Sequence, residues 1–286
     1  MKIVVTGATG FIGSHLIRDL VLRGYDPVAM GRDRSRLDAL SEAHGIQSIS
    51  LDINAPEKEW HAILGKPETV IHLAWGGLDD FNSLAHFEEE LPAHCRFLKS
   101  IIADGVKRVV VAGTCFEYGL EEGELAEDRC PAPVTSYAVA KDSLRRYLTL
   151  LQKREKFSFA WLRYFYMYGP GQGKKALLSQ LDSAIDRGDA VFPMSGGEQL
   201  RDYLPVEEVA RLTSLLATEI ETCGIYNICS GKPISIRRLV ENRAAELGSK
   251  IKLDLGYYPY PVYEPMAFWG DRGKIDHFLS RGTSDR

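Results

Sequence analysis

Three evenly spaced glycines near the start of the chain constrain its fold more than any other feature. Gly7, Gly10 and Gly13 follow an apolar run at residues 3–5 and open a segment at residues 13–24 with apolar residues at helical spacing. In a strand–turn–helix unit, the first glycine permits the tight turn, the second lets the backbone approach a pyrophosphate, and the third allows close packing of helix on strand. The spacing is one residue wider than G-x-G-x-x-G. The sequence therefore predicts a dinucleotide-binding turn, and the alternative is a merely structural turn.

Further strand-like runs follow the glycine loop. They lie at residues 27–30, 47–51, 69–73, 108–111 and 159–162. These runs are continuously apolar rather than alternating, which is typical of a parallel sheet covered on both faces. They alternate with helical segments, of which residues 136–152 carry the strongest periodicity. A further helical segment at residues 84–102 is interrupted by Pro92, where we expect a kink or a boundary. The pattern predicts an α/β fold with a doubly wound (Rossmann) parallel sheet.

The character of the chain changes after Gly169-Pro170-Gly171, where helices and loops dominate. We therefore expect residues 1–168 to form the dinucleotide-binding domain, with later segments returning to it. Residues 169–286 would form mainly a smaller substrate-binding lobe.

The composition of the chain limits the classes of partner and the kinds of site that we expect. The net charge of −4 gives no electrostatic reason to expect nucleic acid. None of the five cysteines lies in a C-x-x-C pair, so a disulfide framework or a metal site is not expected. The chain has no apolar run of about 18 residues and no leader pattern at its start, so we expect no membrane span and a cytoplasmic location.

The end of the second strand bears on the choice of cofactor. This strand ends in Met30-Gly31-Arg32, without the carboxylate that would accept the 2′-hydroxyl of NAD. Arg32 can instead pair with a 2′-phosphate, so NADP(H) is favoured, with NAD(H) possible and a solvated arginine loop as the alternative. After the third strand, Asp52 and Ile53 are expected at the adenine edge, although Asp52 could equally be a helix cap.

A phenol and an ammonium are placed together later in the chain. Tyr137 and Lys141 are four residues apart, so they share one face of the predicted helix. A nearby positive charge should lower the pKa of Tyr137, which could then exchange a proton with a hydroxyl or carbonyl group. Thr114 ends the fifth strand, at the sheet edge where ligands bind, and could contact the same oxygen. We therefore expect Thr114, Tyr137 and Lys141 to be catalytic.

With these features the sequence resembles the extended short-chain dehydrogenase/reductases of the sugar-nucleotide epimerase/dehydratase group. The resemblance covers nearly the whole chain. It rests on Thr6-Gly7-Ala8-Thr9-Gly10-Phe11-Ile12-Gly13, His72-Leu73-Ala74, Gly113-Thr114-Cys115-Phe116-Glu117-Tyr118-Gly119, the Tyr137/Lys141 pair, Arg163-Tyr164-Phe165-Tyr166-Met167-Tyr168-Gly169-Pro170 and Arg201-Asp202-Tyr203.

The resemblance implies further roles. Tyr137 would be the acid/base, Lys141 would also hold the nicotinamide ribose, and Thr114 would orient the substrate. The cofactor would be lined by the glycine loop with Thr9, Phe11 and Ile12, and by Leu73, Ala74, Tyr164 and Phe165. Arg201 would bind the substrate diphosphate, for which its bidentate fork is suited. The alternative for Arg201 is an ion pair with Asp202 or Glu198. A homodimer with the helix at residues 136–152 in the interface is also implied.

Departures from the family pattern narrow the reaction. Related dehydratases carry an acidic residue or pair after the catalytic threonine, where this chain has Cys115 and Phe116, with Glu117 one place later. Dehydration is therefore disfavoured, and Cys115 is expected to be inert. Tyr166 replaces an asparagine that contacts the diphosphate in many relatives. Cys115, Phe116 and Tyr166 would still adjoin the substrate. We expect a 4-ketoreductase of an NDP-4-keto-6-deoxyhexose; the alternatives are a 4-epimerase and a catalytically silent NADP-binding protein.

Overall fold

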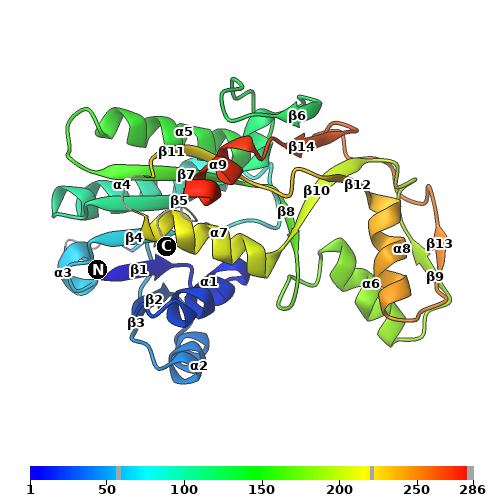
Figure 1. The fold of residues 1–286 in the computed structure, drawn as a ribbon, viewed down its shortest axis with the longest axis horizontal. Coiled ribbons are helices and arrows are strands. Elements are labelled where there is room, and N and C mark those ends of the chain that lie inside the picture. The colour runs from blue at the N-terminus through cyan, green and yellow to red at the C-terminus, as the bar shows by residue number, and fades with distance from the viewer. Residues whose placement is uncertain (56–58, 220–221, 282–286) are drawn as a thin grey trace.

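A parallel sheet lies at the centre of the larger lobe (Figure 1). The computed structural model describes residues 1–55, 59–219 and 222–281, and within them this sheet has seven strands. Their order is β11-β7-β5-β4-β1-β2-β3, and every neighbouring pair is parallel. The strands are β1 (Ile3–Thr6), β2 (Pro27–Gly31), β3 (Ser48–Ser50), β4 (Thr69–His72), β5 (Arg108–Thr114), β7 (Ser158–Tyr164) and β11 (Gly224–Ile228). The predicted doubly wound fold is confirmed.

The strand order reverses direction between β1 and β4. From β1 the chain winds outward through β2 to β3, and from β4 it winds the other way through β5 to β7. Thr6 lies opposite His72 at the ends of these two central strands. Loops that leave β1 and β4 therefore diverge at one edge, which is where doubly wound folds open a ligand crevice.

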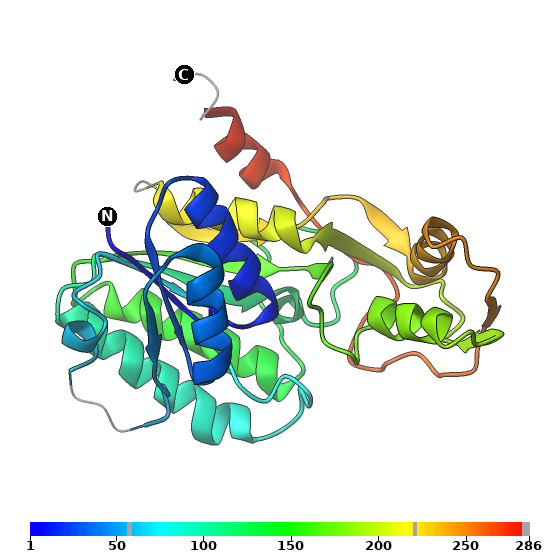
Figure 2. The same ribbon diagram turned by 90° about the horizontal axis from the view of Figure 1, so that it is seen from below.

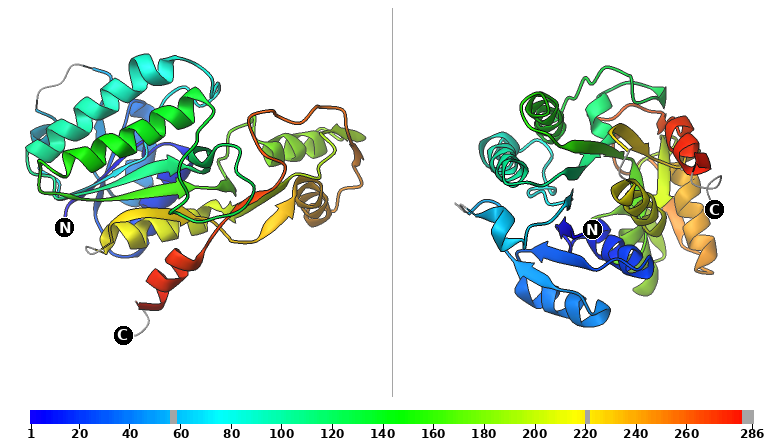
Figure 3. Two further views of the ribbon diagram at one scale, coloured as in Figure 1. Left: turned by 90° about the horizontal axis from the view of Figure 1, so that it is seen from above. Right: turned by 60° about the vertical axis from the view of Figure 1, so that its left-hand side comes forward.

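Helices cover both faces of the sheet, which explains the continuously apolar strands. Ile3 and Val5 pack with α1 (Phe11–Leu22) and α7 (Val206–Thr218) on one face. Val4, between them in sequence, packs on the other face with α4 (Leu91–Ala103) and α5 (Ser136–Leu151). Figure 3 (right) shows this layering, with α4 and α5 in cyan and green on one side and α1 in blue on the other. The shorter helices α2 (Arg34–His44) and α3 (Trp60–Ile63) follow β2 and β3.

The helical segment around Pro92 is divided in two. A π-helical turn, η1 (His86–Glu90), is followed at once by α4, and Pro92 lies in the first turn of α4. A proline is tolerated there because the first amides of a helix have no intrahelical partner. The predicted boundary at Pro92 is therefore confirmed.

A smaller lobe adjoins the carboxyl ends of the large sheet (Figures 1 and 2). Its elements form one three-stranded sheet, a second strand pair and two helices. They are β8 (Tyr166–Tyr168), β10 (Leu200–Pro205) and β12 (Pro233–Ser235), then β9 (Val191–Pro193) with β13 (Lys252–Asp254), and α6 (Leu177–Asp186) with α8 (Ile236–Glu246). A separate apolar cluster from α6, β9 and α8 forms its core.

The chain returns to the larger lobe more than once after β8. The helix α7 packs on α1, β11 pairs with β7, and α9 (Gly273–Arg281) lies against β11. β14 (Phe268–Gly270) pairs with β6 (Gly123–Leu125), beyond the short helix η2 (Cys115–Tyr118) that follows β5. The sequence did not indicate β11 as a strand.

Candidate active site

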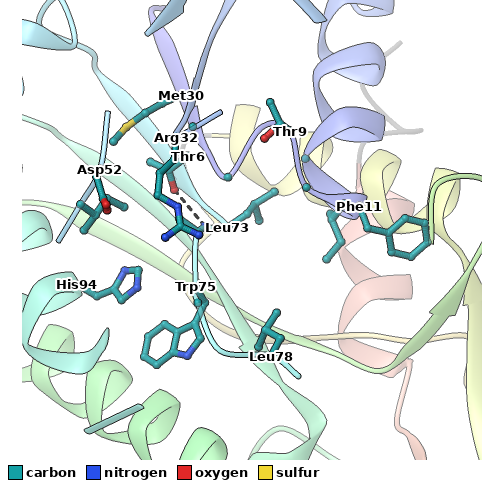
Figure 4. A pocket seen from close by; sticks show the side chains of 18 of the residues that line it. Thr6, Thr9, Phe11, Met30, Arg32, Asp52, Leu73, Trp75, Leu78 and His94 are labelled. Carbon is teal, nitrogen blue, oxygen red and sulfur yellow. Dashed lines mark hydrogen bonds between the residues drawn. The ribbon is translucent and has the colours of Figure 1, made fainter. Parts of the chain in front are cut away.

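A pocket of about 380 Å³ opens at the edge where the strand order reverses (Figure 4). It lies between the loops that follow the first four strands of the large sheet. Eleven of the residues expected at the cofactor line it: Gly7, Thr9, Gly10, Phe11, Ile12, Gly13, Arg32, Asp52, Ile53, Leu73 and Ala74. The structure thus places around one pocket residues that lie in separate motifs of the sequence.

The glycine loop is packed too closely for side chains at two positions. Gly7 has φ +68, and a Cβ there would lie 2.9 Å from the backbone nitrogen of Ala74. A Cβ on Gly13 would lie 2.2 Å from the carbonyl oxygen of Gly7. This packing sets the N-terminus of the 12-residue helix α1 against the pocket. Backbone amides and the helix dipole there favour an anionic ligand.

The arginines after β2 have different surroundings. Arg32 and Arg36 line the pocket, and the Arg36 guanidinium donates to the carbonyl oxygen of Thr9 in the glycine loop. Arg34 instead forms an ion pair along the exposed face of α2. The Asp33 carboxylate accepts a hydrogen bond from the backbone N–H of Arg36 as the N-cap of α2. Arg32 and Arg36 are therefore placed to meet an anion.

Asp52 faces the pocket and also closes a turn. Its Oδ1 accepts a hydrogen bond from the backbone N–H of Asn54 at 3.0 Å. Among the residues that the structure describes, the next helix begins eight residues later, at Trp60. Asp52 is therefore not a helix cap, which was the alternative expectation.

Thr114, Tyr137 and Lys141 come together beside this pocket. Thr114 ends β5, and Tyr137 and Lys141 lie in the first turns of α5. All three are buried, with Lys141 only 1% exposed. The Lys141 ammonium donates to the carbonyl oxygen of Ala112 at 2.9 Å and lies 4.0 Å from the ring centroid of Trp75, which lines the pocket.

Burial shifts the pKa values of Tyr137 and Lys141 in opposite directions. It raises the pKa of Tyr137 above the usual value of 10.0, the Glu117 carboxylate adds to the rise, and a hydrogen bond with Thr114 opposes it. The expectation that Lys141 lowers this pKa is therefore wrong for this structure, because desolvation of the phenolate dominates. Burial lowers the pKa of Lys141 from 10.5 to about 7, against the pull of two carboxylates, those of Glu117 and Glu90.

Glu117 forms a buried ion pair that the sequence did not reveal. Its Oε2 accepts from Arg163 Nε at 2.8 Å, and both side chains are fully buried. Its Oε1 accepts from the backbone N–H of Thr114 at 2.9 Å and from Trp161 Nε1 at 2.8 Å. Glu117 is thus committed to holding the end of β5 and has no freedom to act as an acid or base.

Three of the expected substrate residues lie in one aromatic cluster next to Thr114. The rings of Phe116 and Tyr166 are 6.1 Å apart, and the Arg201 guanidinium lies 5.9 Å from the Tyr166 ring. Cys115 is buried nearby, and burial raises the pKa of its thiol, as expected for an inert cysteine.

Arg201 has an ion-pair partner, but not one that the sequence suggested. Its guanidinium contacts the Glu264 carboxylate through Nη2 at 2.7 Å and Nε at 3.1 Å. Asp202 instead accepts hydrogen bonds from the backbone of Ser230 and its neighbours, and Glu198 accepts one from the Tyr260 hydroxyl. A diphosphate at Arg201 would have to compete with the Glu264 carboxylate.

The side chains of Tyr164 and Phe165 do not reach the pocket. The Tyr164 hydroxyl bonds to Thr213 Oγ1 at 3.0 Å, in the core beneath α7. Phe165 packs with Tyr118 and Phe268. Neither residue lines the pocket, and their expected contact with the cofactor stays a prediction.

A polar network that the sequence reasoning missed lies at the back of the pocket. His72 Nδ1 lies 2.9 Å from Thr6 Oγ1, and His72 Nε2 lies 2.7 Å from His94 Nδ1. His94 Nε2 in turn contacts Glu90 Oε2 at 3.0 Å. Glu90 and His94 line the pocket. Glu90 and His94 are four residues apart, and His72 belongs to the motif His72-Leu73-Ala74, but neither signal indicated a connected network.

Residues 1–55, 59–219 and 222–281 contain neither a metal-binding cluster nor a membrane-spanning helix. In this part of the chain no group of histidine, cysteine and acidic side chains is arranged to hold a metal ion. No helix in it is long and apolar enough to cross a membrane.

The fold and the pocket together define a Rossmann-type protein with a dinucleotide site at its topological switch point. A family model described as the NAD dependent epimerase/dehydratase family matches residues 3–229. The chain therefore belongs to this family.

Relatives and solved structures agree with this assignment. The chain is 29% identical to a "dTDP-6-deoxy-L-talose 4-dehydrogenase (NAD(+))" of Aggregatibacter actinomycetemcomitans, over 94% of this chain and 99% of that protein. It is 27% identical to a "dTDP-4-dehydro-6-deoxyglucose reductase" of Escherichia coli, over 87% of this chain and 82% of that protein. The structure of "MoeE5 in complex with UDP-glucose and NAD" has a TM-score of 0.83 at 30% identity, covering 98% of this chain and 92% of that one.

Gly13→Ala should destabilise the protein. The added Cβ would meet backbone atoms of Gly7 and Ala8 that cannot move aside, so we expect a loss of about 1–3 kcal/mol or more in the free energy of unfolding. Gly173→Ala is the matched control, because a Cβ there meets open space, and its effect should stay within about 0.5 kcal/mol. Urea denaturation measures both, and equal stability of the two variants would contradict the close packing.

The paired histidines should make stability depend on pH. Burial lowers the pKa of His72 and of His94 below 6.5, so below that pH the unfolded chain binds protons that the folded chain does not. Stability should fall as the pH drops from 7.5 to 5.5, by at most about 1.4 kcal/mol for each histidine.

Urea denaturation at the two pH values measures this loss. His94→Gln should lose less stability on acidification than the wild type. The exposed His277→Gln should lose as much as the wild type and serves as the control. An equal loss in wild type and His94→Gln would show that these histidines do not control the pH response.

Proposed function

We propose that the chain reduces the 4-keto group of a nucleotide-linked 6-deoxyhexose, with a nicotinamide dinucleotide as hydride donor. The juxtaposition of buried Thr114, Tyr137 and Lys141 with the dinucleotide pocket carries this proposal. The groups that follow Thr114 offer no second acid or base, because Cys115 is buried and Glu117 is held by Arg163. Without a second acid or base, these residues are limited to chemistry at the ketone itself.

The pocket fits a dinucleotide. The glycine loop and the N-terminus of α1 would hold the pyrophosphate, and Asp52 with Ile53 would meet the adenine. Leu73 and Ala74 would lie along the opposite wall. When bound, the nicotinamide ring supplies the hydride. The side chains of this chain would donate the proton and orient the substrate oxygen.

Tyr137 is suited to donate the proton. Its raised pKa keeps the phenol protonated at neutral pH, and the hydroxyl would protonate the carbonyl oxygen of the substrate. The Thr114 hydroxyl would hydrogen-bond the same oxygen and orient it. The Lys141 ammonium would then stabilise the phenolate that remains on Tyr137.

The names of two relatives support the substrate class. One is a 4-dehydrogenase of a dTDP-6-deoxyhexose, which is the same reaction in reverse, and the other is a reductase of a 4-dehydro-6-deoxyglucose nucleotide. A nucleotide-sugar 4-epimerase is the second candidate, since the family includes epimerases and such an enzyme would use the same three residues. A catalytically silent NADP-binding protein would have no use for these residues.

We also propose a preference for NADP(H). Arg32 and Arg36 supply two positive charges at the end of β2, and Asp33 is occupied as the N-cap of α2. A 2′-phosphate would pair with this cationic pair. The name of the dTDP-6-deoxy-L-talose 4-dehydrogenase specifies NAD(+). We propose that this chain differs from that relative in preferring the cofactor with the 2′-phosphate.

The outer face of α5 supports a homodimer, which we propose as its assembly. Ser143, Tyr147 and Leu150 recur there at helical spacing and stay partly or largely exposed, Leu150 at 60%. A second copy of the helix could cover this face.

Tyr137→Phe should abolish turnover and leave cofactor binding intact, because only the proton donor is removed. We would incubate the wild type and the variant with NADPH or NADH and with dTDP-, CDP- and GDP-4-keto-6-deoxyhexoses, and identify products by NMR. Net oxidation of the cofactor with a 4-hydroxy product is the expected wild-type result.

Other outcomes of this assay decide between the candidates. Interconversion of 4-epimers without net cofactor oxidation would identify an epimerase. Binding of NADPH without turnover of any sugar nucleotide would identify a silent protein. Retained turnover in Tyr137→Phe would overturn the proton-donor role.

Arg32→Ala should weaken NADPH binding and leave NADH binding nearly unchanged. Loss of one charge-assisted contact of about 1.5–3 kcal/mol corresponds to a roughly 10- to 150-fold increase in the Kd for NADPH. Fluorescence titration with both cofactors measures it. Arg34→Ala is the control, because Arg34 points along α2 rather than into the pocket. The same NADPH preference in Arg32→Ala and in the wild type would rule out Arg32 as its source.

A further inference from the structure

The Lys141 ammonium lies against the face of an aromatic ring. Its Nζ is 4.0 Å from the Trp75 ring centroid, closer than to the Tyr137 ring at 5.8 Å. A cation over an aromatic face is attracted by the negative charge of the π-system, and the attraction is larger where water is excluded. Lys141 is 1% exposed, so this contact acts without competition from solvent.

The Trp75 ring is held in place on two sides. Its Nε1–H donates to His86 Nδ1 at 3.1 Å, which fixes one edge. One face stacks on the His94 ring, with centroids 4.5 Å apart and an interplanar angle of 7°. His94 is itself anchored to Glu90 and His86 to the carbonyl oxygen of Asp80. The plane that meets the ammonium is therefore set by a hydrogen bond at one edge of the ring and by stacking on one of its faces.

The ionisable groups around Lys141 come from several elements. Tyr137 precedes it on α5, and Glu117 approaches from η2. Glu90 and His86 belong to η1, His94 to α4 and His72 to β4. Burial favours the neutral amine, while the two carboxylates, Glu117 and Glu90, favour the ammonium. Both carboxylates are engaged elsewhere, Glu117 with Arg163 and Glu90 with His94.

We propose that Trp75 is a positioning residue for Lys141, whose ring face holds the ammonium beside Tyr137 and keeps it charged. A carboxylate in that place would offer a proton acceptor, whereas a ring face stabilises the cation without taking its proton. The catalytic consequence rests on the proposed function, in which the Lys141 charge stabilises the phenolate. The effect on Lys141 itself does not depend on the substrate.

The titration of Lys141 tests this directly. The protein would be labelled with ¹³Cε-lysine, with the Lys141 resonance assigned from Lys141→Met, and its chemical shift followed against pH. The wild-type midpoint is expected at about 7. In Trp75→Leu it should fall by about one pH unit, because loss of the ring face disfavours the charged form.

An isosteric series keeps the test valid if Trp75→Leu disturbs the fold. Fluorinated tryptophans at position 75 weaken the negative face of the ring and preserve its shape and its stacking on His94. The midpoint should fall stepwise with each added fluorine. The same substitutions at Trp269, on β14, are the control and should leave it unchanged. A midpoint that stays constant across the series at position 75 would overturn the proposal.

The kinetic readout separates this proposal from the function on which it rests. In an active reductase, the alkaline limb of kcat should move to lower pH in step with the Lys141 midpoint. A shifted midpoint with no turnover in the substrate panel would refute the proposed function and still support the role of Trp75. Turnover with an unshifted midpoint would support the proposed function and refute the role of Trp75.

Discussion

The buried pair of Glu117 and Arg163 fixes the geometry on which the active site depends. Neither side chain touches solvent, and the carboxylate accepts from Arg163, from Trp161 and from the backbone N–H of Thr114. Taking two charges out of water is costly, and the cost is offset here by the three hydrogen bonds that the carboxylate accepts and by the Tyr118 ring, whose centroid lies 4.4 Å from the Arg163 guanidinium. Removal of one partner of a buried pair typically costs about 3–5 kcal/mol. The end of β5, which carries Thr114, is therefore tied to β7 by a fully buried ion pair.

Burial around this pair also determines where protons reside. The same desolvation that raises the pKa of Tyr137 lowers the pKa of Lys141, since each shift favours the neutral form. At neutral pH the phenol keeps its proton, while Lys141 is close to its own midpoint. A site of this kind is set for giving a proton to an oxygen that gains electrons, which is the direction of the proposed reduction.

Local patterns in the sequence were sufficient to predict most of the fold and part of the candidate active site. Short strand-like runs predicted six strands of the large sheet, and the spacing of Tyr137 and Lys141 placed them on one helical face. Contacts between residues far apart in the sequence could not be predicted from these patterns. Glu117 meets Arg163 across 46 residues and Arg201 meets Glu264 across 63, and neither pair leaves a spacing signal. The rise of the Tyr137 pKa depends on how deeply the phenol is buried, a property of the assembled fold rather than of its neighbour in the helix.

The route of the chain has a consequence for how the protein reaches this state during synthesis. The larger lobe is discontinuous, since α7 and β11 come after β8, α6, β9 and β10 of the smaller lobe. Until β11 has left the ribosome, β7 is an open sheet edge, and until α7 arrives the sheet face beside α1 is only partly covered. The nucleotide pocket, although built from the first residues translated, is thus supported by some of the last. A nascent chain that stops short of α7 would expose both surfaces and be a natural client for chaperones.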